Sequence, residues 1–165
     1  MITIREAQAQ DFKAIQEIAY KTWPDVYGEI LSAAQLDYML KAFYAEEVLK
    51  DNVVHKGHHF ILAFEDDFCL GFASFQHDYL GEKVTRLHKI YLLPEAQGKG
   101  AGKQLVGAVI DYAKHNGSTV ISLNVNRFNK ALTFYQKLGF EVVAEEDIEL
   151  EHGYLMEDYK MEKQL

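Results

Sequence analysis

A glycine-rich segment, Gln97-Gly98-Lys99-Gly100-Ala101-Gly102-Lys103, constrains the fold of this chain more than any other stretch. It follows a continuous apolar run, Ile90-Tyr91-Leu92-Leu93, and opens a segment whose apolar residues recur with helical spacing. The order of strand, glycine turn and helix predicts bare backbone at a helix N-terminus, where free N–H groups and the helix dipole attract phosphate. We therefore expect a ligand that carries phosphate, with Lys99 and Lys103 adding positive charge beside it.

A tight structural turn is the alternative explanation of these glycines. One glycine would fit such a turn, whereas three at alternate positions each cost about 0.5–1 kcal/mol of backbone entropy relative to alanine. Two familiar phosphate loops do not match. A P-loop needs four residues between its glycine and the Gly-Lys pair, but here three residues separate Gly98 from Gly102, and Gln104 stands where the hydroxyl should be. The dinucleotide fingerprint G-x-G-x-x-G fails as well, because the spacing here is G-x-G-x-G.

The segment resembles the acetyl-CoA pyrophosphate loop of the GNAT superfamily of N-acetyltransferases, which has the form Gln/Arg-x-x-Gly-x-Gly/Ala. Gln97, Gly100 and Gly102 match this form. A second block, residues 129–140, resembles the family's later signature, Asn-x-x-Ala-x-x-Phe-Tyr-x-x-x-Gly-Phe, although a single residue separates Asn129 from its alanine. The two blocks stand in the family's order, about 30 residues apart, and the resemblance covers most of the chain.

The resemblance implies an α+β fold, a mixed and mostly antiparallel central sheet of about six to seven strands with helices on both faces. The chain has 165 residues, the usual length of one domain, so we expect a single N-acetyltransferase domain over residues 1–165. The patterning predicts helices that begin after Asp11, after Ser32, after the glycine loop and at Asn129, and we expect Pro24 to end the first of them. The expected strands are residues 2–4, 60–64, 69–75, 84–93, 120–125, 141–148 and 154–161.

The resemblance also implies how acetyl-CoA is held. The strand before the loop would pair with the pantetheine arm and offer a backbone N–H to the thioester oxygen. Asn124 and Asn126 lie where the family's sheet splays, and either contact pantetheine or only satisfy a strand end. Asn129 would serve as a helix cap, as a contact to CoA, or as both. The cofactor-binding candidates are Ile90, Tyr91, Leu92, Gln97, Gly98, Lys99, Gly100, Ala101, Gly102, Lys103, Asn124 and Asn129.

Two residues are candidates for catalysis. In the family, the tyrosine that matches Tyr135 protonates the leaving thiolate, which makes it the general acid; the alternative is a buried helix face. Many relatives carry a glutamate base on the strand before the loop, where this chain has Arg86 and His88. Strand alternation predicts that these two share a face with Ile90 and Leu92. With an unperturbed pKa of about 6.5, His88 is a candidate base, and a structural histidine with the base elsewhere is the alternative.

The acceptor pocket of such a protein would come from the first helices, their connection and the closing strands. Trp23, Tyr27 and Glu29 are its candidates, and their surroundings loosely resemble the diamine and polyamine acetyltransferase branch. Aromatic and acidic side chains there would hold a cationic amine, or the two aromatic residues only close the core. The rival functions are acetylation of a protein N-terminal amine and a non-catalytic acyl-CoA sensor. A homodimer is also implied, in which the strand at residues 159–161 would pair across the axis.

Composition excludes several other classes. A formal net charge of −8 argues against nucleic acid, which requires basic patches, and is compatible with a small cationic amine. No run of about 18 apolar residues is present, so we expect no membrane span, and the N-terminus lacks a signal-peptide pattern. The single cysteine, Cys69, excludes a disulfide framework and a cysteine zinc site. We interpret the cluster His55, His58 and His59 as a surface turn, and expect a cytoplasmic protein without metal.

Overall fold

The computed structural model describes residues 1–165, and at its centre lies a seven-stranded sheet in the order β1-β2-β3-β4-β5-β7-β6. The strands are β1 (Ile2–Glu6), β2 (His58–Glu65), β3 (Phe68–Gln76), β4 (Val84–Leu92), β5 (Val120–Asn126), β6 (Glu141–Glu149) and β7 (Leu155–Gln164). The helices are α1 (Phe12–Tyr27), α2 (Ala33–Tyr44), α3 (Glu46–Val54), α4 (Ala101–His115) and α5 (Ala131–Lys137). Every neighbouring pair is antiparallel except β4 with β5. The expected mixed, mostly antiparallel sheet is confirmed.

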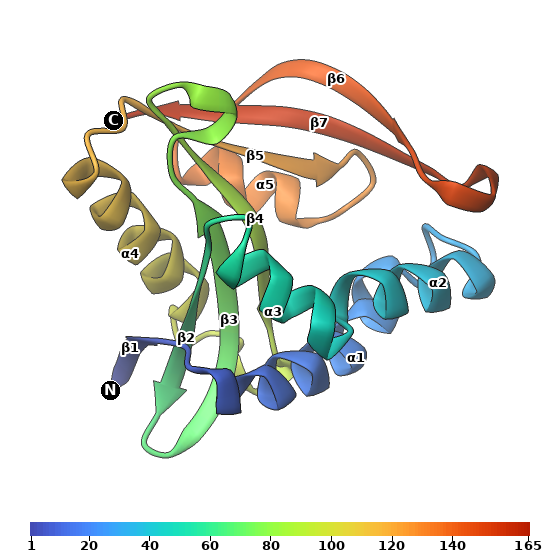
Figure 1. The fold of residues 1–165 in the computed structure, drawn as a ribbon, viewed down its shortest axis with the longest axis horizontal. Helices are drawn as coiled ribbons and strands as arrows, with labels where there is room; N and C mark the ends of the chain where they lie inside the picture. The colour runs from blue at the N-terminus through green and yellow to red at the C-terminus, as the bar shows by residue number, and fades with distance from the viewer.

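Helices cover both faces of this sheet, with α4 on one side and α1 to α3 on the other (Figure 1). Strand alternation produces the two cores. On β2, Ile61 and Ala63 point into the core under α4 and α5, whereas Phe60 and Leu62 point into the core under α1 to α3. All four side chains are buried. The sheet therefore carries a hydrophobic face on each side. None of the helices combines the length and the apolar character that a membrane span requires.

The first two helices begin where the sequence predicts, after Asp11 and after Ser32, but the first does not end where it predicts. Ser32 caps α2, since its hydroxyl accepts the N–H of Gln35 at 3.1 Å. Asp11 does not cap α1 with its side chain; its carboxylate accepts the N–H of Gln8 at 2.8 Å, one turn earlier. The expectation that Pro24 ends α1 was wrong, because the helix continues to Tyr27. A proline costs one hydrogen bond, and the buried Tyr27 ring, packed on neighbouring aromatic rings, offsets that loss.

A gap opens in the sheet between β4 and β5. The two strands pair only from Val84 with Val120 to Leu87 with Leu123. Beyond that point β4 continues without a partner on this side, while β5 stays paired with β7 as far as Asn126. The backbone of β4 therefore presents unpaired groups to the gap, which is the splay that the family resemblance implies.

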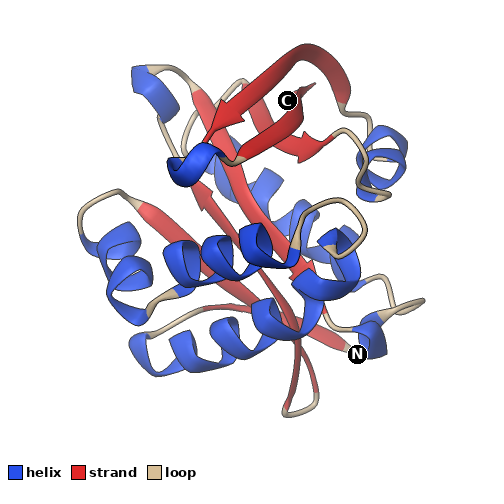
Figure 2. Ribbon diagram, turned by 90° about the vertical axis from the view of Figure 1, so that its right-hand side faces the viewer, coloured by secondary structure: helices blue, strands red, loops and turns tan.

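The strands β6 and β7 form an arm, residues 141–164, that curves away from the rest of the sheet (Figure 2). Its turn reaches α2, where the side-chain amide of Gln35 donates to the carbonyl of Leu155 at 3.0 Å. The expectation that the strand at residues 159–161 pairs across a dimer axis was wrong, because β7 lies between β5 and β6 and has no free edge. The pairing of β6 with β7, which sequence patterning does not specify, covers that edge.

The histidine cluster does not form a surface turn, as we had expected. His55 follows α3, but His58 and His59 begin β2 and point to opposite faces of the sheet. The chain turns at Gly57, which has a φ of 70°, and β2 begins directly after it. As a result His58 stacks on His88 of β4, with ring centroids 4.2 Å apart.

Candidate active site

The three loop glycines each have a conformational or packing requirement. Gly98 and Gly100 lie in the left-handed region, with φ of 77° and 75°, which glycine adopts without strain. A Cβ at Gly102 would lie 3.0 Å from Leu92 Cδ1 and 3.3 Å from Phe134 Cζ. This glycine lets α4 approach both β4 and α5 closely. The number of glycines therefore does not by itself indicate a ligand; the exposed backbone does.

A row of backbone N–H groups at the start of α4 has no acceptor in the protein. These groups belong to Gly98, Gly100, Ala101, Gly102 and Lys103. They border a cavity of about 580 Å³, here named the loop cavity, which Gln97 and Lys103 also line. Lys99 forms an ion pair with Glu65 instead. Free donors at a helix N-terminus beside an unpaired lysine are an arrangement that attracts anions such as phosphate.

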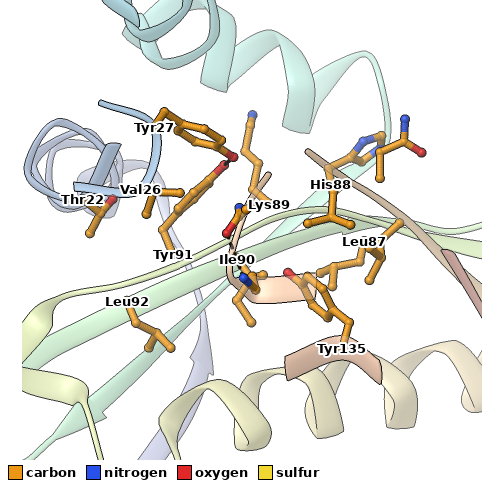
Figure 3. A pocket seen from close by; sticks show the side chains of 15 residues that line it. Thr22, Val26, Tyr27, Leu87, His88, Lys89, Ile90, Tyr91, Leu92 and Tyr135 are labelled. Carbon is orange, nitrogen blue, oxygen red and sulfur yellow. Dashed lines mark hydrogen bonds between the residues drawn. The ribbon is translucent and has the colours of Figure 1, made fainter. Parts of the chain in front are cut away.

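A second, narrow cavity of about 140 Å³ lies in the gap between β4 and β5. Figure 3 shows it with the side chains that line it. It shares Thr22, Val26 and Leu92 with the loop cavity. At its other end it shares Tyr27, His88, Lys89, Tyr91 and Asn124 with a third cavity of about 820 Å³, the large cavity. The narrow cavity therefore lies between the loop cavity and the large cavity and adjoins both.

Tyr135 and Asn129 both line the narrow cavity. Tyr135 is 7% exposed, and its hydroxyl points toward β4 in Figure 3. Burial, with a smaller contribution from the charge of Tyr27, raises the pKa of the Tyr135 phenol well above its ordinary value, so it keeps its proton at neutral pH. Asn129 accepts the N–H of Ala131 at 2.9 Å and so caps the first turn of α5.

The large cavity lies under the β6–β7 arm, between α1, α2 and α3. Trp23 and Tyr27 both line it, and the Tyr27 hydroxyl lies 2.8 Å from that of Tyr91. Glu29, the third acceptor candidate, lies two residues beyond the end of α1, is exposed, and lines none of the three cavities. The charged side chains in the large cavity are Glu47, Asp51, Lys56, Lys89 and Asp158.

A β-bulge at His88 changes which side chains of β4 face this cavity. On β3, Ser74 pairs with Lys89 and Phe75 with Leu87, so His88 has no partner. The expected alternation is therefore broken. His88, Lys89 and Tyr91 face the large cavity, whereas Ile90 and Leu92 pack toward α4 (Figure 3). The expectation that His88 shares a face with Ile90 and Leu92 was wrong because of this extra residue.

His88 is held in its neutral form. Its Nε2 lies 2.9 Å from Gln76 Oε1, and its ring stacks on His58. Burial first, then the charges of His58, Arg86 and Lys89, lowers the pKa of His88 to about 3. A group with that pKa is a weak proton acceptor at neutral pH. This environment favours the structural interpretation of His88.

Sequence reasoning missed two charged residues of the large cavity. Burial raises the pKa of Asp158 on β7 to about 6, and the side-chain amide of Asn124 lies 3.4 Å from its Oδ2. Burial lowers the pKa of Lys89 to about 8, and its Nζ lies 5.1 Å from the centre of the Tyr44 ring. The position of Asp158 depends on its pairing with Asn126, and that of Lys89 on the bulge. Neither has a local sequence signal.

The chain matches the acetyltransferase (GNAT) family over residues 12–140. It belongs to this family. It is 32% identical to the N-acetyltransferase YuaI of Bacillus subtilis over 91% of this chain and 86% of the relative. It is 29% identical to the spermidine N(1)-acetyltransferase of Thermoplasma acidophilum over 86% of this chain and 89% of the relative. The PaiA N-acetyltransferase of Thermoplasma acidophilum, solved in complex with coenzyme A, superposes with a TM-score of 0.84 at 26% identity, covering 100% of this chain and 99% of that one.

This membership confirms the family resemblance of the two sequence blocks. The chain is an acetyl-CoA-dependent N-acetyltransferase, and acetyl-CoA is its cosubstrate. Its fold is that of the solved relatives, including the YncA acetyltransferase of Salmonella typhimurium with acetyl-CoA, at a TM-score of 0.67 and 26% identity over 100% of this chain and 94% of that one.

Proposed function

We propose that this acetyltransferase moves the acetyl group directly to the primary amine of a small cationic acceptor of the polyamine type, with Tyr135 as general acid. One observation carries the proposal: the narrow cavity, which Tyr135 lines, lies between the loop cavity and the large cavity and shares lining residues with both. Direct transfer needs donor and acceptor at two ends of one path, so that the reacting atoms meet without a covalent enzyme intermediate.

Several features of the chain fit acetyl-CoA, which supplies an acetyl group activated as a thioester. The unpaired N–H groups of the loop and the ammonium of Lys103 would hold the diphosphate. The free side of β4 at Ile90, Tyr91 and Leu92 would pair with the pantetheine arm, and one of its N–H groups would stabilise the thioester oxygen. Asn124 and Asn129 line the narrow cavity beside this path.

Tyr135 would protonate the leaving sulfur. The phenol is protonated at neutral pH, as an ordinary tyrosine is, and no group of the protein accepts a hydrogen bond from its hydroxyl, which leaves that proton free for the sulfur. His88, the candidate base from the sequence, is poorly suited because of its lowered pKa and its contact with Gln76. The proton acceptor for the amine must then be a different group.

The acceptor class rests on the large cavity and on the relatives. Aromatic rings at Trp23, Tyr27 and Tyr44 and the carboxylate of Asp158 provide cation–π and charge contacts for an ammonium group. The spermidine N(1)-acetyltransferase relative, at 29% identity, favours a polyamine over a protein N-terminus. The ribosomal-protein-S18-alanine N-acetyltransferase of Escherichia coli shares only 20% identity, which supports the fold alone.

The test is amine-dependent release of free CoA from acetyl-CoA over a panel of polyamines, aminoglycosides, amino acids and short peptides. We expect turnover with spermidine or a related diamine. Turnover confined to peptides would replace the polyamine acceptor by a protein N-terminus. If the protein binds acetyl-CoA but releases no CoA with any amine of the panel, a non-catalytic sensor would be favoured instead.

A further inference from the structure

Resting on the proposed function, we propose that Asp158 receives the ammonium group of the acceptor and removes its proton before transfer. The large cavity has several charged groups, but the structure distinguishes this carboxylate from the others by its burial, its missing partner and its position beside the narrow cavity.

The Asp158 side chain is buried and incompletely bonded. It is 6% exposed, and its Oδ1 has no hydrogen-bond partner in the protein. Its Oδ2 accepts only a long contact of 3.4 Å from the side-chain amide of Asn124. A buried carboxylate oxygen without a donor is unfavourable. Oδ1 is covered as well as unsatisfied, so a ligand's N–H group would reach it after a rotation of the carboxyl group toward the cavity.

The position of Asp158 suits contact with an amine about to react. It pairs with Asn126 at the end of β5, in the part of β5 that has parted from β4. Asn124, its hydrogen-bond partner, lines both the narrow and the large cavity. Asp158 therefore lies on the large-cavity side of the opening through which the two substrates would meet.

Of the other carboxylates near the cavity, Glu47 is exposed to solvent, and Asp51 and Glu146 are already engaged. Asp51 contacts His55 at 3.0 Å and Lys56 at 3.6 Å. Glu146 accepts the Asn124 amide at 3.0 Å and comes from the edge strand β6. Asp158 belongs to no ion pair, because the nearby Arg127 pairs with carboxylates of β6 instead.

The charges around Asp158 come from every element packed against it. Arg86 of β4 and Arg127 after β5 are the nearby cations, Glu146 of β6 is a second carboxylate, and Tyr27 of α1 is a titratable hydroxyl. The other titratable groups that line the same cavity are Glu47, Asp51, Lys56, His58, His88 and Lys89. Burial outweighs the nearby guanidinium groups and raises the pKa of the carboxyl to about 6. A base with a pKa near the working pH both exists in its ionised form and accepts a proton readily.

The proton step balances within the site. One N–H bond of the bound ammonium breaks, its electron pair stays on nitrogen, and the proton joins Asp158 Oδ1. The neutral amine then has the lone pair that attack on the acetyl carbon needs. Asp158 returns to its ionised form by passing this proton to water, so it is unchanged after one turnover.

The experiment compares wild type, Asp158→Asn, Asp158→Glu and the matched control Glu157→Gln. Glu157 precedes Asp158 on β7, points to the opposite face, and lines none of the three cavities. CoA release with spermidine would be measured from pH 5 to 9, together with calorimetric titration of spermidine into each protein saturated with CoA. Thermal melting with and without CoA reports on folding and on cosubstrate binding.

We expect Asp158→Asn to bind CoA normally, to lose about 100-fold in kcat/KM at neutral pH, and to bind spermidine at least about tenfold more weakly. The wild-type profile should bend at about pH 6, where Asp158 titrates. This bend should be absent from Asp158→Asn, whose kcat/KM should rise steadily from pH 5 to 9 as free amine accumulates. Asp158→Glu should recover part of the activity, and Glu157→Gln should resemble wild type.

Two kinds of failure are distinguishable. If wild type acetylates an amine and Asp158→Asn keeps the same activity, spermidine affinity and pH profile, the role of Asp158 is overturned. The proposed function would still stand. Wild-type protein that binds CoA but neither acetylates nor binds any amine of the panel would overturn the proposed function, and this inference with it.

Discussion

The imidazole rings of His58 and His88 stack across the intervening strand β3, with centroids 4.2 Å apart and planes 17° from parallel. Burial is the main cause that lowers the pKa of His58 to about 4 and that of His88 to about 3. The positive charge of Lys89 lowers both pKa values further. Both rings are therefore neutral in the folded protein at neutral pH, while the unfolded chain would protonate them near pH 6.5.

Acid should destabilise the protein through this pair. Between pH 6.5 and about 4 the unfolded state binds more protons at these sites than the folded state, so the free energy of unfolding falls as the pH falls. We expect His88 to account for about 1–2 kcal/mol of the loss between pH 7 and pH 5. Urea unfolding at these two pH values would measure it.

The matched variants for this test are His88→Gln and His55→Gln. His88→Gln should reduce the loss on acidification, whereas His55→Gln, at an exposed position after α3, should leave it unchanged. Asp158 acts in the opposite direction, since its raised carboxyl pKa makes the folded state bind more protons, and its effect is common to all three proteins. An equal pH dependence in wild type and His88→Gln would contradict the assignment.

The two loop lysines should differ in their contribution to acetyl-CoA binding. Lys103 borders the loop cavity without an ion pair, whereas Lys99 is paired with Glu65. We expect Lys103→Gln to weaken CoA binding about three- to tenfold at low salt, because an exposed charge near phosphate contributes of order 1 kcal/mol. Lys99→Gln should have a smaller effect. Calorimetric titration at two salt concentrations would test this, and the Lys103 effect should shrink at the higher one.

The sequence predicted the glycine turn between β4 and α4, the α+β class and most of the elements because these depend on local patterns. Glycine positions, helical periodicity and the Ser32 cap act within a few residues of one another. The same local reasoning misplaced the end of α1, since a packed Tyr27 outweighed Pro24. Elements of strong periodicity were thus predictable, and their ends were less so.

The charged part of the candidate site was not predictable from local patterns. His88 forms a bulge only because of how β4 pairs with β3, and this bulge turns Lys89 into the large cavity. Asp158 is buried only because β7 pairs with β5 inside the sheet. Such relations join residues far apart in the chain, and one sequence carries no direct signal of them.

Two glycine variants should have effects of opposite sign on stability. A Cβ at Gly71 on β3 would lie 2.5 Å from the carbonyl oxygen of Tyr91 and 3.0 Å from Leu92 Cα. These are backbone atoms of β4 and cannot move aside cheaply, so Gly71→Ala should lower the free energy of unfolding by about 2 kcal/mol. A Cβ at Gly107 in α4 meets nothing within 4 Å, so Gly107→Ala should raise it by about 0.5–1 kcal/mol.

Chemical denaturation of the two variants beside wild type would measure these changes. Gly71→Ala should also weaken CoA binding, because the displaced part of β4 borders the narrow and the loop cavities at Leu92. A Gly71→Ala protein as stable as wild type would mean that β3 and β4 separate more easily than their ladder indicates.

The hydroxyl of Tyr135, and not its ring, should carry its contribution to catalysis. The ring packs edge-to-face on Phe134 and Phe140, with centroids 5.3 Å and 5.8 Å away. Tyr135→Phe keeps these contacts, so we expect less than about 1 kcal/mol change in stability and an unchanged affinity for CoA. Its kcat should fall by about 100-fold, since the leaving sulfur loses its proton donor.

The control for Tyr135→Phe is Tyr112→Phe, which removes a hydroxyl from α4 that contacts Glu6 at 3.5 Å, outside the three cavities. This variant should keep the wild-type kcat. The measurement is the steady-state rate of CoA release at saturating acetyl-CoA and amine, with thermal melting for stability. A Tyr135→Phe protein that turns over within threefold of wild type would mean that the ring only packs, and that water or another group protonates the sulfur.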